Sequence, residues 1–167
     1  MMDHQKWIDP FVGHLQQLAQ RDDRAALAKL RRGLGREPGE VVEALPLVVP
    51  WIPDSPAGRW AFVVAPLFAL HPSHADAGDF GRSFRLLGDE ESFEKRFSAL
   101  LNSHEDELPA RLRQAVALMK SKDVRIDFRR LLRDLTGWSH ESRFVQLRWA
   151  RSYWGRPTEN DPSSDSN

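Results

Sequence analysis

RIDFRRLLRDLTGWSHESRFVQLRWARSYW, residues 125–154, is the most informative stretch of this chain, because it predicts two helices joined by a tight turn. Asp127 stands where an N-cap is expected, since its carboxylate can accept a bond from an unpaired backbone N–H of the first turn. Apolar residues then recur at spacings of three and four and share one helix face: Phe128, Leu131, Leu132 and Leu135. Gly137 predicts the end of this helix, because glycine adopts the left-handed conformation without steric cost.

The second helix of the pair is expected to begin at Ser139, whose hydroxyl can cap its first turn. Its apolar residues form one stripe with helical spacing: Val145, Trp149 and Tyr153, widened by Phe144 and Leu147. We expect Trp149 and Tyr153 in the core. Arginines occupy the flanks of both helices: Arg129, Arg130, Arg133, Arg143, Arg148 and Arg151.

Charge is distributed unevenly along the chain. The 167 residues carry 24 Lys+Arg and 24 Asp+Glu, so the formal net charge is zero. Residues 111–156 nevertheless contain twelve of the cations and only four of the acids, an excess of eight positive charges. Such local asymmetry favours a surface that binds a polyanion over a randomly decorated helix face.

Composition restricts the class of protein. A chain that is 41% hydrophobic and 29% charged is typical of a globular fold, and zero cysteines exclude disulfides, thiolate catalysis and Cys-ligated zinc. No apolar run approaches the roughly 20 residues that span a membrane. The amino-terminal MMDHQKWIDP lacks the pattern of a signal peptide. We therefore expect a cytoplasmic protein without membrane contact.

Helical periodicity continues upstream of this pair. Helices are expected to begin at Asp9-Pro10 and at Asp22 or Asp23, the second of them ending near Gly33. Prolines break residues 36–58, so only a short helical piece over 40–45 fits there.

A strongly apolar helix is expected over 57–70, after Pro56, and it should be central and buried, although Pro66 can kink it. Residues 71–83 predict a mobile loop, and 89–102 and 108–122 predict two more amphipathic helices. No segment alternates as a strand does.

The predicted architecture is therefore all-α, a helical bundle of about eight or nine helices arranged in two lobes. We place an N-terminal helical lobe at 1–72, a C-terminal basic helical lobe at 73–155, and a disordered tail at 156–167, which is rich in Ser, Pro and Asp.

A catalytic constellation is not recognisable. The sequence lacks the phosphate-binding loop, HExxH, GxSxG and GxGxxG motifs. His71 and His74 are spaced to share a metal ion, but no third ligand is near in sequence, so we expect neither a metal site nor a cofactor. Adjacent acidic pairs diverge by about 100° on a helix and do not converge on one point.

Six segments are informative when they are taken together in their order along the chain: FVGHLQQLAQRDDRAALAKLRRGLG (11–35), LFALHP (67–72), FGRSFRLL (80–87), FEKRFSALL (93–101), IDFRRLLRDLTGW (126–138) and VQLRWARSYW (145–154). In order and spacing they resemble the CasB family, the small subunits of the type I-E CRISPR surveillance complex called Cascade. The resemblance covers roughly residues 5–154.

This resemblance implies an all-helical, two-lobed protein without enzymatic activity. Two copies would pack against the backbone subunits that coat the guide RNA and against the large subunit. The protein would contact the guide RNA only indirectly. It would offer a basic surface to the target or displaced DNA strand and help to hold that strand in the R-loop.

Candidate nucleic-acid-binding residues follow from the charge distribution and the resemblance together. The predicted face consists of Arg111, Arg113, Lys120, Arg129, Arg143 and Arg148, with Arg59, Arg82 and Arg96 as outlying contributors. Arg130 and Arg133 are candidates for ion pairs within the fold instead. Arginines bind phosphates without reading bases, so the predicted binding depends on salt and not on sequence.

Two other interpretations remain open. Residues 127–154 can be drawn as a helix–turn–helix whose second helix reads DNA, which would make the protein a sequence-specific regulator. Alternatively, the chain is a helical scaffold whose basic face binds acidic proteins.

Overall fold

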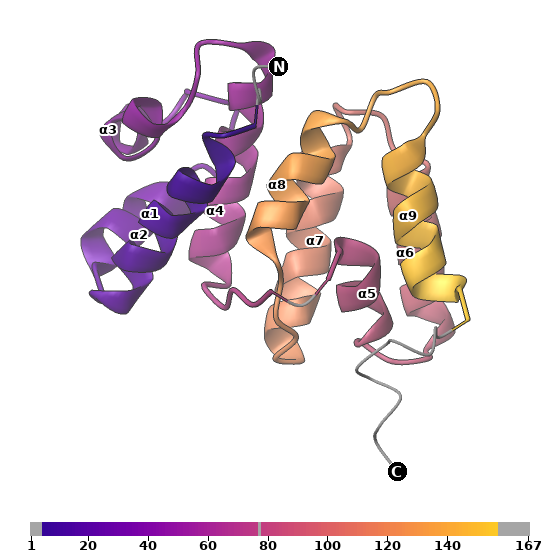
Figure 1. Ribbon diagram of the computed structural model, residues 1–167. Coiled ribbons are helices and arrows are strands. Elements are labelled where there is room, and N and C mark those ends of the chain that lie inside the picture. Colours follow the sequence, from indigo (N-terminus) through magenta and orange to yellow (C-terminus); the bar gives the residue numbers. More distant parts are fainter. Residues whose placement is uncertain (1–4, 77, 157–167) are drawn as a thin grey trace.

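Every regular element is a helix in the computed structural model, which describes residues 5–76 and 78–156 (Figure 1). Nine α-helices and three 3-10 helices occupy these ranges, which confirms the all-α prediction and the expected number of helices. Within the same ranges the only β-type pairing is an isolated bridge between His74 and Ile126. None of the described helices is both long and apolar enough to cross a bilayer.

The first half of the chain forms seven short elements: α1 (Ile8–Gln20), α2 (Arg24–Arg31), η1 (Val42–Ala44), α3 (Leu45–Val48), η2 (Val49–Trp51), η3 (Pro56–Trp60) and α4 (Ala61–Leu70). Asp23, one of the two predicted caps, accepts a 3.1 Å bond from the Ala26 amide. Pro66 lies inside α4 with its ring against Gly33, where an added Cβ would stand 2.7 Å from the proline Cγ. Glycine at 33 therefore lets the end of α2 approach α4.

The second half forms five helices: α5 (Phe80–Arg85), α6 (Glu91–Leu101), α7 (Leu108–Ser121), α8 (Phe128–Thr136) and α9 (Phe144–Trp154). The Asp127 cap of α8 is confirmed, because its carboxylate accepts a 3.1 Å bond from the Arg130 amide. Gly137 does end α8, but at φ −104°, so the left-handed conformation expected there was wrong.

Helices distant in sequence pack side by side. α8 lies against α1 and α4, and α9 lies against α5 (Figure 1). α5 and α9 approach so closely that a methyl group on Gly81 would overlap the backbone of Trp149. Trp149 is fully buried, as predicted, and packs against Phe80 and Trp138. This packing fixes the two helices that carry Arg82 and Arg148.

Two predicted helix starts were wrong. α1 begins at Ile8, so Asp9 lies within the first turn and its carboxylate contacts Arg129 and Arg133 instead of capping the helix. α9 begins at Phe144 and not at Ser139, because Arg143, directly before the helix, adopts a left-handed conformation (φ 54°). Ser139 donates its hydroxyl to Glu105.

Other predicted boundaries and burials also changed. The predicted loop 71–83 ends early, since α5 starts at Phe80, and the turn before α4 is a 3-10 helix. The short piece over 40–45 is η1 followed by α3. Phe144 and Leu147 do not widen a buried stripe, because they are 39% and 52% exposed.

The division into lobes at residue 72 remains a prediction. Figure 1 shows α1–α4 gathered on one side and α5, α6 and α9 on the other, with α8 between them. The expected disordered tail lies, from residue 157 onward, outside the described residues.

Candidate nucleic-acid interface

Two predicted residues from different helices meet in a groove between α6 and α7. Arg96 and Arg111 line this groove together with Lys95, and no acidic residue lines it. Its remaining lining is mostly apolar: Phe84, Ala99, Leu100, Gln114 and Ala115. We call this the α6–α7 groove. Three cations beside an apolar floor provide a surface that attracts anions such as phosphate.

The ion pairs at the rim of the α6–α7 groove are weak. Lys95 lies 3.4 Å from Glu91 and Arg111 lies 3.3 Å from Glu107, in both cases four residues apart on an exposed helix surface. Such pairs contribute about 0.3–0.5 kcal/mol. No ion pair to Arg96 occurs within the described residues. The cations can therefore exchange these partners for phosphate oxygens at little cost.

Arg113 and Lys120 face away from the α6–α7 groove. Arg113 follows Arg111 by two residues, which places it across the helix, and its Nη1 lies over Gly35, 3.1 Å from where a Cβ would be. Lys120 follows seven residues later on the same side of α7 and is exposed. The predicted residues of α7 therefore divide between two faces.

Arg148 is held at the surface by a buried carboxylate. Its Nη2 lies 3.5 Å from Oδ1 of Asp134, and its guanidinium lies 5.0 Å from the centre of the Phe144 ring. Asp134 also accepts a 2.8 Å bond from the Trp149 indole N–H. Burial raises the pKa of Asp134, although the Trp149 bond and the charges of Arg148 and Arg130 act in the opposite direction. Arg148 is thus oriented while about half its side chain, 48%, stays exposed.

Arg143 joins the start of α9 to the end of α6. Its Nη2 donates a 2.8 Å bond to the Leu101 carbonyl, and the residue is exposed. One guanidinium nitrogen thus has a structural role, while the side chain remains at the surface.

Arg129 is surrounded by groups of the chain itself. It donates to Gln16 Oε1 at 3.0 Å and contacts His74 Nε2 at 3.1 Å, Asp76 at 3.4 Å and Asp9 at 3.8 Å. We call this set the Arg129 hub. It joins α8 to α1 and to the segment before α5, so a structural role for Arg129 accompanies the predicted role in binding.

Part of the Arg129 hub also groups potential metal ligands. Ligand atoms of His74, Asp76 and Asp127 lie within 4.8 Å of one another. The His74 Nδ1 already accepts a 3.2 Å bond from the Phe128 amide, and Asp127 caps α8. The Arg129 guanidinium lies against the other imidazole nitrogen. A positive guanidinium beside these ligand atoms opposes a metal ion, and His71, which precedes His74 by three residues, contacts the Val124 carbonyl at 2.7 Å.

The two remaining predicted residues lie apart from the α6–α7 groove. Arg59 is exposed on η3, among the helices of the first half. Arg82 is half-buried in the first turn of α5, where its amide bonds to Asp79 and its side chain runs beside Gly78. Arg130 and Arg133 were both expected to form internal ion pairs. The ion pair of Arg133 is confirmed, because its guanidinium lies 3.7 Å from the Asp9 carboxylate. The positive charge of Arg130 acts to lower the pKa of Asp134.

Lys95 is the cation of the α6–α7 groove that the sequence prediction missed. Phe93, Phe97 and Leu100 form the buried face of α6, which leaves Lys95 and Arg96 off that face. The sequence shows this periodicity, but it does not show that Arg111 of α7 lies in the same groove as Lys95 and Arg96.

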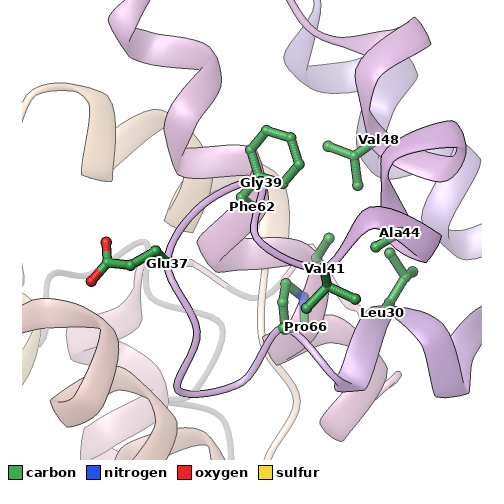
Figure 2. Close-up of a pocket in the computed structure, with 10 residues that line it drawn as sticks. Leu30, Glu37, Gly39, Val41, Ala44, Val48, Phe62 and Pro66 are labelled. Atoms are coloured by element: carbon green, nitrogen blue, oxygen red, sulfur yellow. The ribbon is translucent and has the colours of Figure 1, made fainter.

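A small hollow among the first helices has a different character. Leu30, Val48, Phe62 and Pro66 line it, and the Glu37 carboxylate points away from it (Figure 2). Apolar walls without a cation do not suit phosphate, so this hollow is not part of the candidate interface.

Fold and surface together define a small all-α protein with cations on several helix faces. A family model for CRISPR-associated protein Cse2 matches residues 26–154. The chain therefore belongs to the Cse2 family, also called CasB, which confirms the resemblance seen in the sequence. The CRISPR-associated protein Cse2 of Thermus thermophilus is 39% identical over an alignment of 155 residues that covers 87% of this chain and 88% of that protein.

Solved structures agree with this assignment. The crystal structure of CasB from Thermus thermophilus matches with a TM-score of 0.79 and 36% identity, over 93% of this chain and 100% of the other. CasB from M. ruber matches with a TM-score of 0.72 and 34% identity, over 89% and 93%. A chain of a CRISPR RNA-guided surveillance complex matches with a TM-score of 0.78 and 26% identity, over 89% and 92%.

Proposed function

We propose that this chain is a non-catalytic small subunit of a cytoplasmic CRISPR RNA-guided surveillance complex, and that it stabilises the R-loop by binding the backbone of the displaced DNA strand. Its partners are the backbone and large subunits, a second copy of itself and the target DNA, with guide RNA contacted indirectly. Family membership and the likeness to a chain of such a complex support the assembly. The three cations of the α6–α7 groove carry the proposal for nucleic acid.

The energetics of strand exchange make such a surface useful. An RNA–DNA heteroduplex is about as stable as the DNA duplex that it replaces, so modest contacts to the displaced strand can shift the balance. Each cation that neutralises a phosphate releases counterions, and this gain does not depend on base sequence. Lys95, Arg96 and Arg111 offer only donors, which suit phosphate oxygens.

The regulator hypothesis finds less support. In a helix–turn–helix protein the second helix presents side chains that reach base edges, usually with amide or guanidinium groups. The exposed side of α9 carries two arginines, but it also carries Phe144, Leu147 and Trp154, large apolar side chains that offer few groups to a base edge. Its glutamine, Gln146, is buried and donates to the Trp138 carbonyl at 2.8 Å.

Binding of the purified chain to unrelated single- and double-stranded DNAs across a salt series tests the nucleic-acid proposal. We expect equal affinity for all sequences and a steep decrease with salt. Arg96→Glu combined with Arg111→Glu should weaken binding and reduce the slope of log K against log salt by about 0.7 per lost phosphate contact on single strands.

Arg24→Glu provides a control, because Arg24 is exposed on α2 and its ion pair is with the exposed Asp22. This variant should bind as the wild type does. A strong preference for one duplex sequence would favour the regulator instead. Absence of binding at low salt, or equal losses in both variants, would contradict a role for the α6–α7 groove.

A further inference from the structure

Three large apolar side chains remain exposed on one side of α9. Phe144, Leu147 and Trp154 are 39%, 52% and 48% exposed. Spacings of three and seven residues put them on the same helix face. Arg148 and Arg151 occupy the intervening positions of that face and are exposed as well. We call these five residues the outer face of α9.

Most of the outer face of α9 lies away from the core. The opposite side of the helix buries Val145 and Trp149 completely and packs on α5. An ordinary surface helix has one apolar side, whereas α9 has two; on the second, Trp154 contacts Phe97 of α6, yet Phe144, Leu147 and Trp154 all remain partly exposed. Apolar side chains gathered in this way on a surface mark an interaction site.

Charge indicates what kind of partner fits. α9 contains no acidic residue, and Arg151 makes no ion pair within the described part of the chain. The Arg148 guanidinium lies over the Phe144 ring, which orders it before any partner arrives. A complementary surface therefore has an apolar hollow for Leu147 and Trp154 with carboxylates at its edge.

The aliphatic residue at the centre separates a protein partner from a nucleic acid. Leu147 has no ring on which a base can stack and no donor for phosphate, so it gains only from burial against apolar atoms. Trp, Phe and Arg are enriched at the centres of protein interfaces. We infer that the outer face of α9 docks this chain onto an acidic and apolar surface of another protein subunit. This inference rests on the proposed function, which supplies the assembly.

Incorporation into the complex tests the inference. The full chain is co-expressed with the guide RNA and the other protein subunits of the same organism's complex, one of which carries an affinity tag. Native mass spectrometry then measures how much of the chain is retained. Leu147→Ser should lower incorporation about tenfold or more, because burial of a leucine side chain against apolar atoms contributes roughly that factor to affinity. The thermal midpoint of the isolated chain should not change, because Leu147 is largely exposed.

Val49→Ser is the matched control, because Val49 is 50% exposed on η2 and lies away from α9. It should leave incorporation unchanged. Equal incorporation of both variants would overturn the inference. A loss of DNA affinity in isolated Leu147→Ser comparable to that of the Arg96 and Arg111 variant would reassign the face to nucleic acid.

Two further results separate this inference from the proposed function. If sedimentation shows an isolated wild-type dimer that Leu147→Ser dissociates, a second copy covers the face and the inference is wrong. If the wild-type chain is absent from the purified complex, both proposals fail. If it is retained but binds no DNA, only the nucleic-acid proposal fails, and the Leu147 comparison still decides the docking role.

Discussion

The indole N–H of Trp149 donates a 2.8 Å hydrogen bond to the carboxylate of Asp134, and neither residue is more than 4% exposed. This bond joins α9 to α8. The same carboxylate lies 3.5 Å from Arg148 at the surface. One buried acid thus connects the packing of the core to the orientation of a predicted phosphate-binding arginine.

Asp134→Ala should lower the free energy of unfolding by about 1–3 kcal/mol, because it leaves the buried Trp149 N–H without an acceptor. Urea unfolding followed by tryptophan fluorescence measures the loss. Asp134→Asn is the control, since its amide oxygen can still accept that bond. Equal losses in both variants would show that the charge, and not the hydrogen bond, matters.

Stability should also depend on pH through Asp134. Burial raises its pKa above the ordinary value of 3.8, so the folded state binds more protons than the unfolded state between 3.8 and the folded pKa. The free energy of unfolding contributed by this group therefore falls as pH rises through that window and stays low above it. Asp134→Asn should remove this component. The free energy of unfolding of the variant minus that of the wild type should therefore increase with pH. Parallel pH profiles of the two proteins would contradict the raised pKa.

Local spacing explains which features the sequence could predict. Asp127 caps α8 through an amide three residues away, and Asp23 caps α2 in the same way, so both were readable. Residues from distant segments could not be placed in this way. The Arg129 hub gathers groups from α1, from the segment before α5 and from α8, and its geometry depends on the packed fold.

Periodicity also has a physical limit on α9. Spacing predicted correctly that Val145 and Trp149 are buried, but it wrongly added Phe144 and Leu147 to the buried side. Gly81 lets α5 approach the backbone of Trp149, and Leu147 remains outside this contact. For the candidate interface, the sequence predicted Arg96 and Arg111 but not that Arg113 lies across α7 beside Gly35.

Gly81→Ala tests the close approach of α5 and α9. A methyl group there would overlap the Trp149 carbonyl, so the helices must separate, and we expect a loss of about 1–3 kcal/mol. Gly13→Ala is the matched control, because Gly13 lies inside α1 with no atom within 4 Å of an added Cβ. Alanine at 13 should stabilise the protein by about 0.5–1 kcal/mol. Thermal and urea unfolding of the two variants should thus change in opposite directions, and a stabilised Gly81→Ala would contradict the packing.

Arg129→Ala separates a structural role of the Arg129 hub from phosphate binding. The side chain is only 30% exposed and contacts Gln16 and His74 as well as two carboxylates, so its removal should cost about 1–2 kcal/mol of unfolding free energy. Arg133→Ala is the control, because Arg133 is more exposed and its described ion pair is a 3.7 Å contact with Asp9; its stability should change by about 0.5 kcal/mol or less. DNA binding of both variants is measured in the same salt series. Unchanged stability together with weaker DNA binding in Arg129→Ala would assign the guanidinium to phosphate and not to the hub.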